Sequence, residues 1–344
     1  ALAVQTENFT DIYDKVEDDT EGAGLGLVLI IMFMKSMDVD PCNFTIRSEE
    51  GVTVSTVVIP VNLKKPEMIT AIKGQILKEV DGLPTFPDNI VQLLTLCSSD
   101  DADINDIASR IKKDVALATD VIKLANSAGF ITSRKVDDIP TAVVKIGLKN
   151  VKSILLVSTA RKIMESRYRS FEDLWEHCNR TAYYSRMIMS IYYRKEEAEN
   201  AYMAGLLHDL GQLILTAIDV EAIKKISYIA QDRNILNATV MEELTIGISH
   251  SEIGGLVAGK WGFHPMLVEI IQYHHSPQRV SKEYRKSANA VYLANMLCGI
   301  EKRKYYYYYL EQQVLDEFGI KSEEQLFDLH SRLRDEYSRL QKLL

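Results

Sequence analysis

Proline and cysteine are both scarce in this chain of 344 residues, which contains 8 prolines and 4 cysteines. Few prolines favour helix, because proline cannot donate a backbone hydrogen bond and clashes with the preceding turn of a helix. The cysteines lie far apart and form no CxxC pair: Cys42, Cys97, Cys178 and Cys298. The sequence therefore suggests neither a zinc knuckle nor a disulfide framework, and a reducing cytoplasm is the expected location.

The chain also lacks a long hydrophobic run and an excess of basic residues. Its most apolar stretch, Gly24 to Met34, falls well short of the roughly 20 residues that span a bilayer, and we expect a buried helix there. The formal net charge is −8. The segment PTAVVKIGLKNVKSIL superficially resembles a helix-turn-helix, but the charge argues against nucleic-acid binding. Neither a membrane nor a nucleic acid is an expected partner.

The pattern of apolar residues changes near residue 65. Two β-branched runs precede this point, at 43–47 and 52–61, and their alternation predicts a hairpin that turns at Glu50-Gly51. After it, apolar residues recur every three or four positions, which is the helical period. The predicted domains are a small α/β fragment at 1–65, a helical domain at 66–282, and C-terminal helices at 283–344 that pack on or extend the helical domain.

Capping residues divide the second part into helices. Asp88, Asp103 and Asp114 can each cap a helix, and Gly147 is expected to separate a short helix that starts at Pro140 from a longer one. The other predicted helices are 68–80, 149–165, 171–194, 196–210, 219–231, 239–246, 250–261, 265–273, 286–300 and two near the C-terminus. The chain begins at Ala1 without a methionine, so its natural start is expected further upstream. The sequence predicts a mainly all-α protein.

Six of the seven histidines fall within a hundred residues of each other, which prompts a test for a metal site. The pair His208-Asp209 ends an apolar helix just before Gly211, where a turn can direct both side chains to one side. Convergence of side chains from several helices is one way to build a metal site, and imidazole with carboxylate suits Zn, Mn or Fe. The residues predicted to cluster come from four helices: His177, His208, Asp209, His250, His274 and His275. His264 is interpreted as a helix-entry residue and His330 as a surface residue.

Several separated motifs carry a resemblance to a known family. They are LPTFP, DINDIASRIKKDVALATDVIKLANSAGF, IPTAVVKIGLKNVKSILL, WEHCNRTA, AYMAGLLHDLGQLIL, and HSEIGGLVAGKWGFHP followed by HH. In this order, over about residues 79–280, they resemble the HDOD domain, the HD-related output domain of bacterial signalling proteins. The resemblance implies an HD-like helical bundle that acts as a regulatory output through other signalling proteins. A homo-oligomer is compatible with the sequence.

The catalytic relatives of this family, the HD-GYP cyclic-di-GMP phosphodiesterases, retain the six clustered residues but differ at three other places. This chain has Gln212 where they have a lysine, no GYP tripeptide after the histidine pair, and Asn295 where they have a last metal-binding aspartate. An amide in place of a carboxylate weakens binding of a divalent cation, and the missing lysine could have offset phosphate charge. We therefore expect a degenerate, non-catalytic site in which a divalent metal is still an open question. The alternative is a metal-dependent phosphohydrolase acting on cyclic-di-GMP or another nucleotide.

A glycine-rich segment, EGAGLGL, places Gly22, Gly24 and Gly26 ahead of the apolar helix. FTDIYDKVEDDTEGAGLGLVLI with NFTIRSEEGVTVSTVVIP resembles the last third of a histidine-kinase-like (GHKL) ATPase domain, in which such glycine amides meet the triphosphate at a helix N-terminus. The asparagine-bearing helix and the DxGxG turn of that family do not occur in this chain. We interpret these glycines as the remnant of an ATPase-like module, with a purely structural helix start favoured over nucleotide binding.

Two further features receive structural interpretations. Asn126-Ser127 is expected to close a turn ahead of Gly129 rather than to contact a ligand. The tyrosine run 305–309 is expected to cover a neighbouring helix, with docking of a partner as the alternative.

Overall fold

The structure is a computed structural model, and it describes most of the chain. The described residues are 27, 30, 31, 34, 39–49, 51–59, 71–99, 101–126, 136–169, 171–193, 195–218, 223–224, 238–300 and 307–341. Gly22, Gly24, Gly26, Ser127 and most of the helix predicted at 219–231 lie outside them.

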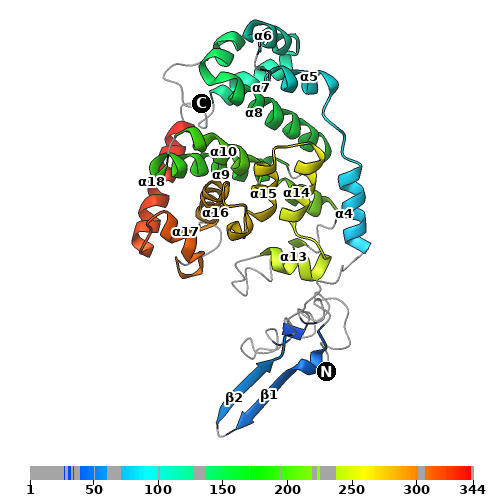
Figure 1. Ribbon diagram of the computed structural model, residues 1–344, viewed down its shortest axis with the longest axis vertical. Coiled ribbons are helices and arrows are strands. Elements are labelled where there is room, and N and C mark those ends of the chain that lie inside the picture. Colours follow the sequence, from blue (N-terminus) through cyan, green and yellow to red (C-terminus); the bar gives the residue numbers. More distant parts are fainter. Residues whose placement is uncertain are drawn as a thin grey trace. The chain divides into compact units, whose positions relative to one another are not determined.

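The described chain is mainly helical, with one two-stranded sheet, so the predicted fold class is confirmed (Figure 1). The strands are β1 (Phe44–Glu49) and β2 (Val52–Val57). The first helices are α4 (Ala71–Asp81), α5 (Asp88–Leu96), α6 (Ile104–Lys113), α7 (Val115–Ala125), α8 (Ile139–Arg167), α9 (Phe171–Tyr192), α10 (Lys195–Leu207) and α11 (Leu210–Ile218). They are followed by α13 (Ala238–Ile246), α14 (His250–Lys260), α15 (Pro265–Tyr273), α16 (Arg285–Ile300), α17 (Gln312–Glu317) and α18 (Glu323–Gln341).

The chain divides into two compact units. One comprises residues 1–79 and 218–249, and the other comprises 80–217 and 250–344. The domain boundaries predicted near residues 65 and 282 stay a prediction.

The first unit contains the predicted hairpin. β1 and β2 pair antiparallel, with Phe44 opposite Val57 and Glu49 opposite Val52. Gly51 has a φ of 80°, a left-handed conformation that glycine adopts without steric cost, and it forms part of the turn. All residues of β2 are exposed. The small α/β fragment is thus present as a helix-and-hairpin segment, since the described residues between 27 and 34 are helical.

In the second unit, α6 and α8 each begin at a capping aspartate. Asp103 caps α6 by accepting a hydrogen bond from the Asn105 backbone N–H (2.8 Å), and Asp138 caps α8 in the same way through Thr141 (2.9 Å). Asp88 is the first residue of α5 and not its cap, because Pro87 occupies the cap position. Gly147, with φ 76° and ψ 157°, interrupts α8 where the sequence predicted two helices.

Asn126 closes the loop between α7 and α8, as predicted. Its side-chain oxygen accepts a hydrogen bond from the Val136 backbone N–H, and its side-chain nitrogen donates to the Val136 carbonyl, both at 2.8 Å. The amide side chain thus pairs with both backbone groups of one residue and cross-links two points of the chain that are ten positions apart. Asn126 therefore has the structural role expected of it, while Ser127 lies outside the described residues.

Helix α9 runs through the middle of the second unit and packs against α10, α16 and α18 (Figure 1). Among the described residues, one helical stretch, Glu197–Ile218, is long and apolar enough by composition to cross a membrane, but 72% of its window is buried inside the fold. Such a stretch is typical of a core helix. It includes α11, which the sequence analysis missed; Leu213, Ile214 and Leu215 are buried there.

The C-terminal helices complete an apolar cluster with α9 and α10. Its largest members include Tyr183, Tyr184, Leu297, Phe318 and Tyr337. Tyr307 packs against this cluster and donates its hydroxyl to the Ile320 carbonyl (3.1 Å), whereas Tyr308 is 84% exposed. The described part of the tyrosine run therefore both covers the core and faces solvent.

His330 was predicted to lie on the surface, and this prediction is wrong. Its exposed fraction is 5%, and its ring lies edge-on to Tyr184 at a centroid distance of 6.3 Å. The reason is that α18 turns its apolar side, which includes Leu326, Leu329 and Leu333, towards the core.

Candidate metal centre

The turn that carries His208 and Asp209 depends on a glycine. α10 ends at Leu207 and α11 begins at Leu210, so the pair lies in the turn between two core helices. A Cβ atom on Gly211 would lie 2.0 Å from the His250 carbonyl oxygen and 2.5 Å from the Gly254 backbone nitrogen. Only glycine therefore allows the start of α11 to approach α14 closely enough to bring Asp209 to His250.

The structure brings all six predicted residues together around the Asp209 carboxylate. One oxygen, Oδ2, lies 3.5 Å from Nε2 of His177 and 3.3 Å from Nε2 of His208. The other, Oδ1, lies 3.4 Å from Nε2 of His250 and 3.3 Å from Nε2 of His274. His275 completes the cluster, with its Nε2 atom 3.1 Å from Nε2 of His250.

These residues form two sets of metal-type ligands that share one carboxylate. The first set is His177, His208 and Asp209, and the second is Asp209, His250, His274 and His275. Within each set, the donor atoms lie within 4.8 Å of one another. A shared carboxylate between two sets is the arrangement that can hold two metal ions side by side.

Two of the imidazoles have their tautomer set by the backbone. Nδ1 of His208 donates to the Gly205 carbonyl and Nδ1 of His274 donates to the Ile271 carbonyl, each at 2.7 Å. A carbonyl can only accept, so Nδ1 carries a proton in both rings and Nε2 is the nitrogen that faces Asp209. Histidine ligands of metals are commonly oriented in this way.

His208 and Asp209 are the two groups of the cluster whose pKa values favour a charged form. Burial opposes a charged His208, but the adjacent Asp209 carboxylate outweighs burial and raises the pKa of His208 well above its ordinary value. Burial also acts against the Asp209 carboxylate, yet the adjacent His208 imidazole holds the pKa of Asp209 well below the usual range. Burial lowers the pKa of His274 to about 4 and that of His275 well below normal, so both rings are neutral.

Two buried polar atoms of the cluster are available to a cation. Nε2 of His208 and Oδ1 of Asp209 have no hydrogen-bond partner of acceptable geometry. Imidazole nitrogens and a carboxylate, with the donor atoms of each set within 4.8 Å of one another, are the donor set of Zn²⁺, Mn²⁺ or Fe²⁺. The residues present therefore fit a divalent metal.

The structure also describes Gln212 and Asn295, two of the residues at which this chain differs from the hydrolases. The Gln212 side chain donates along its own helix to the Thr216 hydroxyl (3.5 Å). Asn295 is half-buried on α16, a helix that packs against α9. No cation stands at position 212 and no carboxylate at position 295.

The sequence analysis missed the groups that support the ligands. Cys178 is a buried thiol that interacts with His208, and burial raises the pKa of Cys178. It follows His177 directly, but neighbours on a helix point about 100° apart, so its position in the sequence does not place it at the cluster. The carbonyls of Gly205 and Ile271 were also missed, although each lies three residues before its histidine. His264, by contrast, caps α15 as predicted: its Nδ1 accepts from the Met266 N–H (3.2 Å).

The helical fold and the histidine–aspartate cluster place the chain among HD-like helical domain proteins. Residues 83–277 match the HDOD domain family, and since this match covers more than half of the chain, the protein belongs to that family. A relative from Treponema pallidum (strain Nichols), an uncharacterised protein, is 29% identical over 309 residues, which is 90% of this chain. The chain spans 60% of the length of that relative.

Three solved structures are similar in fold. A candidate phosphohydrolase from Shewanella amazonensis SB2B is 24% identical, with a TM-score of 0.58 over 79% of this chain and 98% of its own. An HDOD domain protein of unknown function from Geobacter sulfurreducens is 21% identical, with a TM-score of 0.62 over 79% and 97%. A candidate signal transduction protein from Marinobacter aquaeolei VT8 is 20% identical, with a TM-score of 0.57 over 78% and 65%.

Proposed function

We propose that this protein is a bacterial signal-transduction output module whose HD-like site binds a divalent metal without hydrolysing a phosphodiester. The observation that carries the proposal is the Asp209 carboxylate, which faces the Nε2 atoms of four imidazoles. The module acts through contacts with other cytoplasmic signalling proteins. A metal held by these residues would link α9, α14 and the end of α15 to the turn between α10 and α11, so their arrangement would depend on metal.

The metal would be held by the two ligand sets that share Asp209. When bound, such a metal polarises a phosphoryl oxygen and lowers the pKa of a coordinated water. The chain itself contributes the orientation of the rings, through the Gly205 and Ile271 carbonyls, and excludes water by burying His208 and His274 completely.

Two substitutions support a non-catalytic role. Glutamine at position 212 offers no positive charge to balance a phosphate, and asparagine at position 295 offers no charged oxygen to a metal. Both changes reduce the electrostatic stabilisation that the hydrolases have for a phosphodiester transition state.

The second candidate function is a metal-dependent phosphohydrolase acting on cyclic-di-GMP or another nucleotide. The shared carboxylate between the two ligand sets favours it, because two adjacent metals can clamp both the attacking and the leaving oxygen. A Shewanella neighbour is also named as a candidate phosphohydrolase, although its identity of 24% supports only the fold.

Elemental analysis and a hydrolysis assay separate these candidates. The purified protein is loaded with Zn²⁺, Mn²⁺ or Fe²⁺ and assayed on cyclic-di-GMP and on bis(p-nitrophenyl) phosphate. We expect bound metal and no turnover. Turnover that is abolished in His208→Ala would contradict the non-catalytic proposal, and a metal-free protein under all loading conditions would contradict the metal site.

A double variant tests why the site is inactive. Gln212→Lys with Asn295→Asp restores the two charges of the hydrolase pattern and is expected to create detectable hydrolysis. Thr216→Ala serves as a control for disturbance of α11, since it removes the partner of Gln212 without adding charge. Hydrolysis in the control as well as in the double variant would show that charge is not the missing element.

We further propose that the N-terminal segment is the remnant of an ATPase-like module and does not bind nucleotide by itself. The helical residues between 27 and 34 followed by the β1–β2 hairpin agree with the last elements of such a domain. Titration with a fluorescent ATP analogue is expected to give no saturable binding. Saturable binding that is lost in Gly24→Ala would contradict this proposal.

A further inference from the structure

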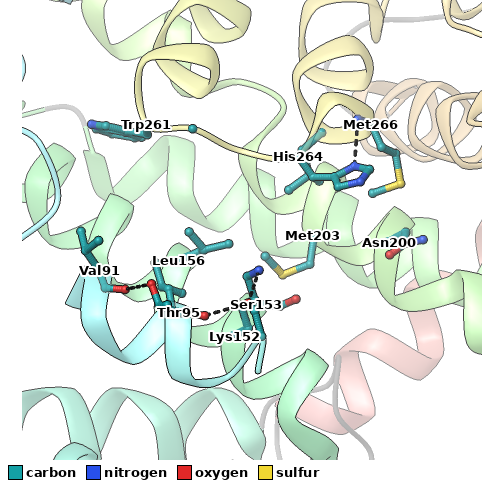
Figure 2. A pocket seen from close by; sticks show the side chains of 14 residues that line it. Val91, Thr95, Lys152, Ser153, Leu156, Asn200, Met203, Trp261, His264 and Met266 are labelled. Atoms are coloured by element: carbon teal, nitrogen blue, oxygen red, sulfur yellow. Dashed lines mark hydrogen bonds between the residues drawn. The ribbon is translucent and has the colours of Figure 1, made fainter. Parts of the chain in front are cut away.

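A cavity of about 660 Å³ lies between α5, α8, α10 and the loop that joins α14 to α15 (Figure 2). It is lined by residues of the second unit only, and none of the six residues of the histidine cluster lines it. Its volume is within the range of sites that enclose a small organic ligand, roughly 300 to 1,000 Å³.

The walls of the cavity are mostly apolar. Leu156 from α8, Met203 from α10 and Met266 from α15 line it, and Trp261 lies at one side (Figure 2). Val91 on α5 also lines the cavity and is 47% exposed. Methionine side chains adapt to irregular ligand shapes, and an apolar concave surface that stays open to water is typical of a binding site.

A single positive charge stands in this apolar surface. Lys152 on α8 donates from Nζ to the Ser98 hydroxyl (2.7 Å), which itself donates to the Leu94 carbonyl (2.8 Å). Among the described residues that line the cavity, none is acidic, and Lys152 forms no ion pair with a described carboxylate. Figure 2 shows its amine directed into the space below the α14–α15 loop. The amine is thus held in place by a neutral hydroxyl and not by a described carboxylate.

The other polar groups of the cavity are neutral. His264 accepts the Met266 N–H at Nδ1, so its ring proton is on Nε2, and Asn200 on α10 supplies an amide. Sites for di- and triphosphates combine several cations or a row of backbone N–H groups. One lysine with neutral hydrogen-bonding groups matches a ligand with a single negative charge.

We propose that this cavity binds a small organic monoanion, a carboxylate attached to an apolar chain or ring. The carboxylate pairs with Lys152 beside Ser98, and the apolar part packs against Leu156, Met203 and Trp261. The site is separate from the metal centre and does not depend on its occupancy.

Decanoate and its neutral counterpart decanol test the proposal by isothermal titration calorimetry on the full chain, below the concentrations at which either aggregates. Because a charge-assisted hydrogen bond is stronger than a neutral one, we expect decanoate to bind roughly tenfold more tightly than decanol. In Lys152→Met this difference disappears, while decanol affinity is retained. Equal affinities in the unmodified protein, or an unchanged preference in Lys152→Met, would overturn the proposal.

Three controls sharpen the test. Lys145→Met removes an exposed charge from the same helix outside the cavity and is expected to leave the preference intact. Leu156→Trp fills the cavity and is expected to weaken both ligands at least tenfold, with unchanged circular dichroism. Decyl phosphate, which carries close to two charges, is expected to bind no more tightly than decanoate; tighter binding would overturn the assignment to a monoanion.

Discussion

Asp209 is the residue on which the geometry of the histidine cluster depends. It is the only described carboxylate among the six clustered residues, and each of its oxygens faces two imidazoles at 3.3 to 3.5 Å. A carboxylate buried in this way is stable only beside a positive charge. Either a proton on His208 or a metal ion supplies that charge, and a metal satisfies more of the lone pairs.

Asp209→Asn is expected to weaken metal binding strongly, because an amide supplies no negative charge. At a metal concentration about 100 times the dissociation constant, the unmodified protein gains about 2.7 kcal/mol, or roughly 5 to 10 °C in Tm. In the variant we expect the metal to raise Tm by less than about 2 °C at the same metal concentration. Asp328→Asn, an exposed change on α18, serves as the control and is expected to retain the full shift. Differential scanning fluorimetry with and without metal measures both.

Gly211 is expected to be intolerant of any side chain. A Cβ atom there meets backbone atoms of α14 at 2.0 and 2.5 Å, so Gly211→Ala must push α11 away from α14 and is expected to cost about 1 to 3 kcal/mol or more, with loss of metal binding. The control is Gly259→Ala on α14. A Cβ atom at position 259 meets nothing within 4 Å, so this change is expected to be neutral or stabilising by up to about 1 kcal/mol. Urea unfolding compares the two, and equal stabilities would contradict the close approach.

At the level of the element, the position of α8 depends on one interruption. Gly147 has φ 76° and ψ 157°, a region of backbone space that is essentially restricted to glycine, and it redirects the chain between the capped start of the helix and the segment that carries Lys152. No neighbouring atom lies within 4 Å of a Cβ at this position. The requirement for glycine is therefore conformational and not steric crowding.

Gly147→Ala is expected to destabilise the second unit by about 1 to 3 kcal/mol, the cost of holding a non-glycine residue in this region. Gly259→Ala, inside α14 of the same unit and with an open environment, is the matched change at an ordinary helical position and is expected to be neutral or stabilising by up to about 1 kcal/mol. Chemical denaturation followed by circular dichroism distinguishes them. A neutral Gly147→Ala would show that α8 can run straight through this point.

At the level of the whole molecule, the fold separates the four thiols by accessibility. Cys42 is exposed, whereas Cys97, Cys178 and Cys298 are buried. Burial also raises the pKa of Cys97 to about 11, so this thiol stays protonated at pH 8.5 and is a poor nucleophile.

We expect iodoacetamide at pH 8.5 to modify Cys42 first, even though its hydrogen bond to Asp40 raises its own pKa, because it is the accessible thiol. The three buried thiols are expected to react at least tenfold more slowly in the folded protein and equally fast in urea. Mass spectrometry of tryptic peptides measures each site. Fast labelling of Cys97 or Cys298 in the native protein would contradict the packing of their helices.

The local features could be predicted because neighbouring residues determine them. The hairpin turn at Gly51, the cap at Asp103, the interruption at Gly147 and the cross-link at Asn126 each follow from residues within about ten positions. α11 was not predicted, because the turn at His208-Asp209 indicated the end of a helix and not that a second helix begins at Leu210. His330 was misplaced because a charged helix with one apolar side does not reveal how completely that side is covered.

The sequence by itself determined the helical class, the family and the six residues that gather at the candidate metal centre, because motif spacing and helical periodicity record local preferences. Only the tertiary structure decided that Asp209 lies between two pairs of imidazoles, that backbone carbonyls set two tautomers, and that Lys152 stands in an apolar cavity. Apart from the contacts of His208 and the carbonyl contact of His274, which are local, these features arise from contacts between residues more than 30 positions apart. Such contacts depend on how helices pack, and no local pattern encodes the packing distance that Gly211 permits.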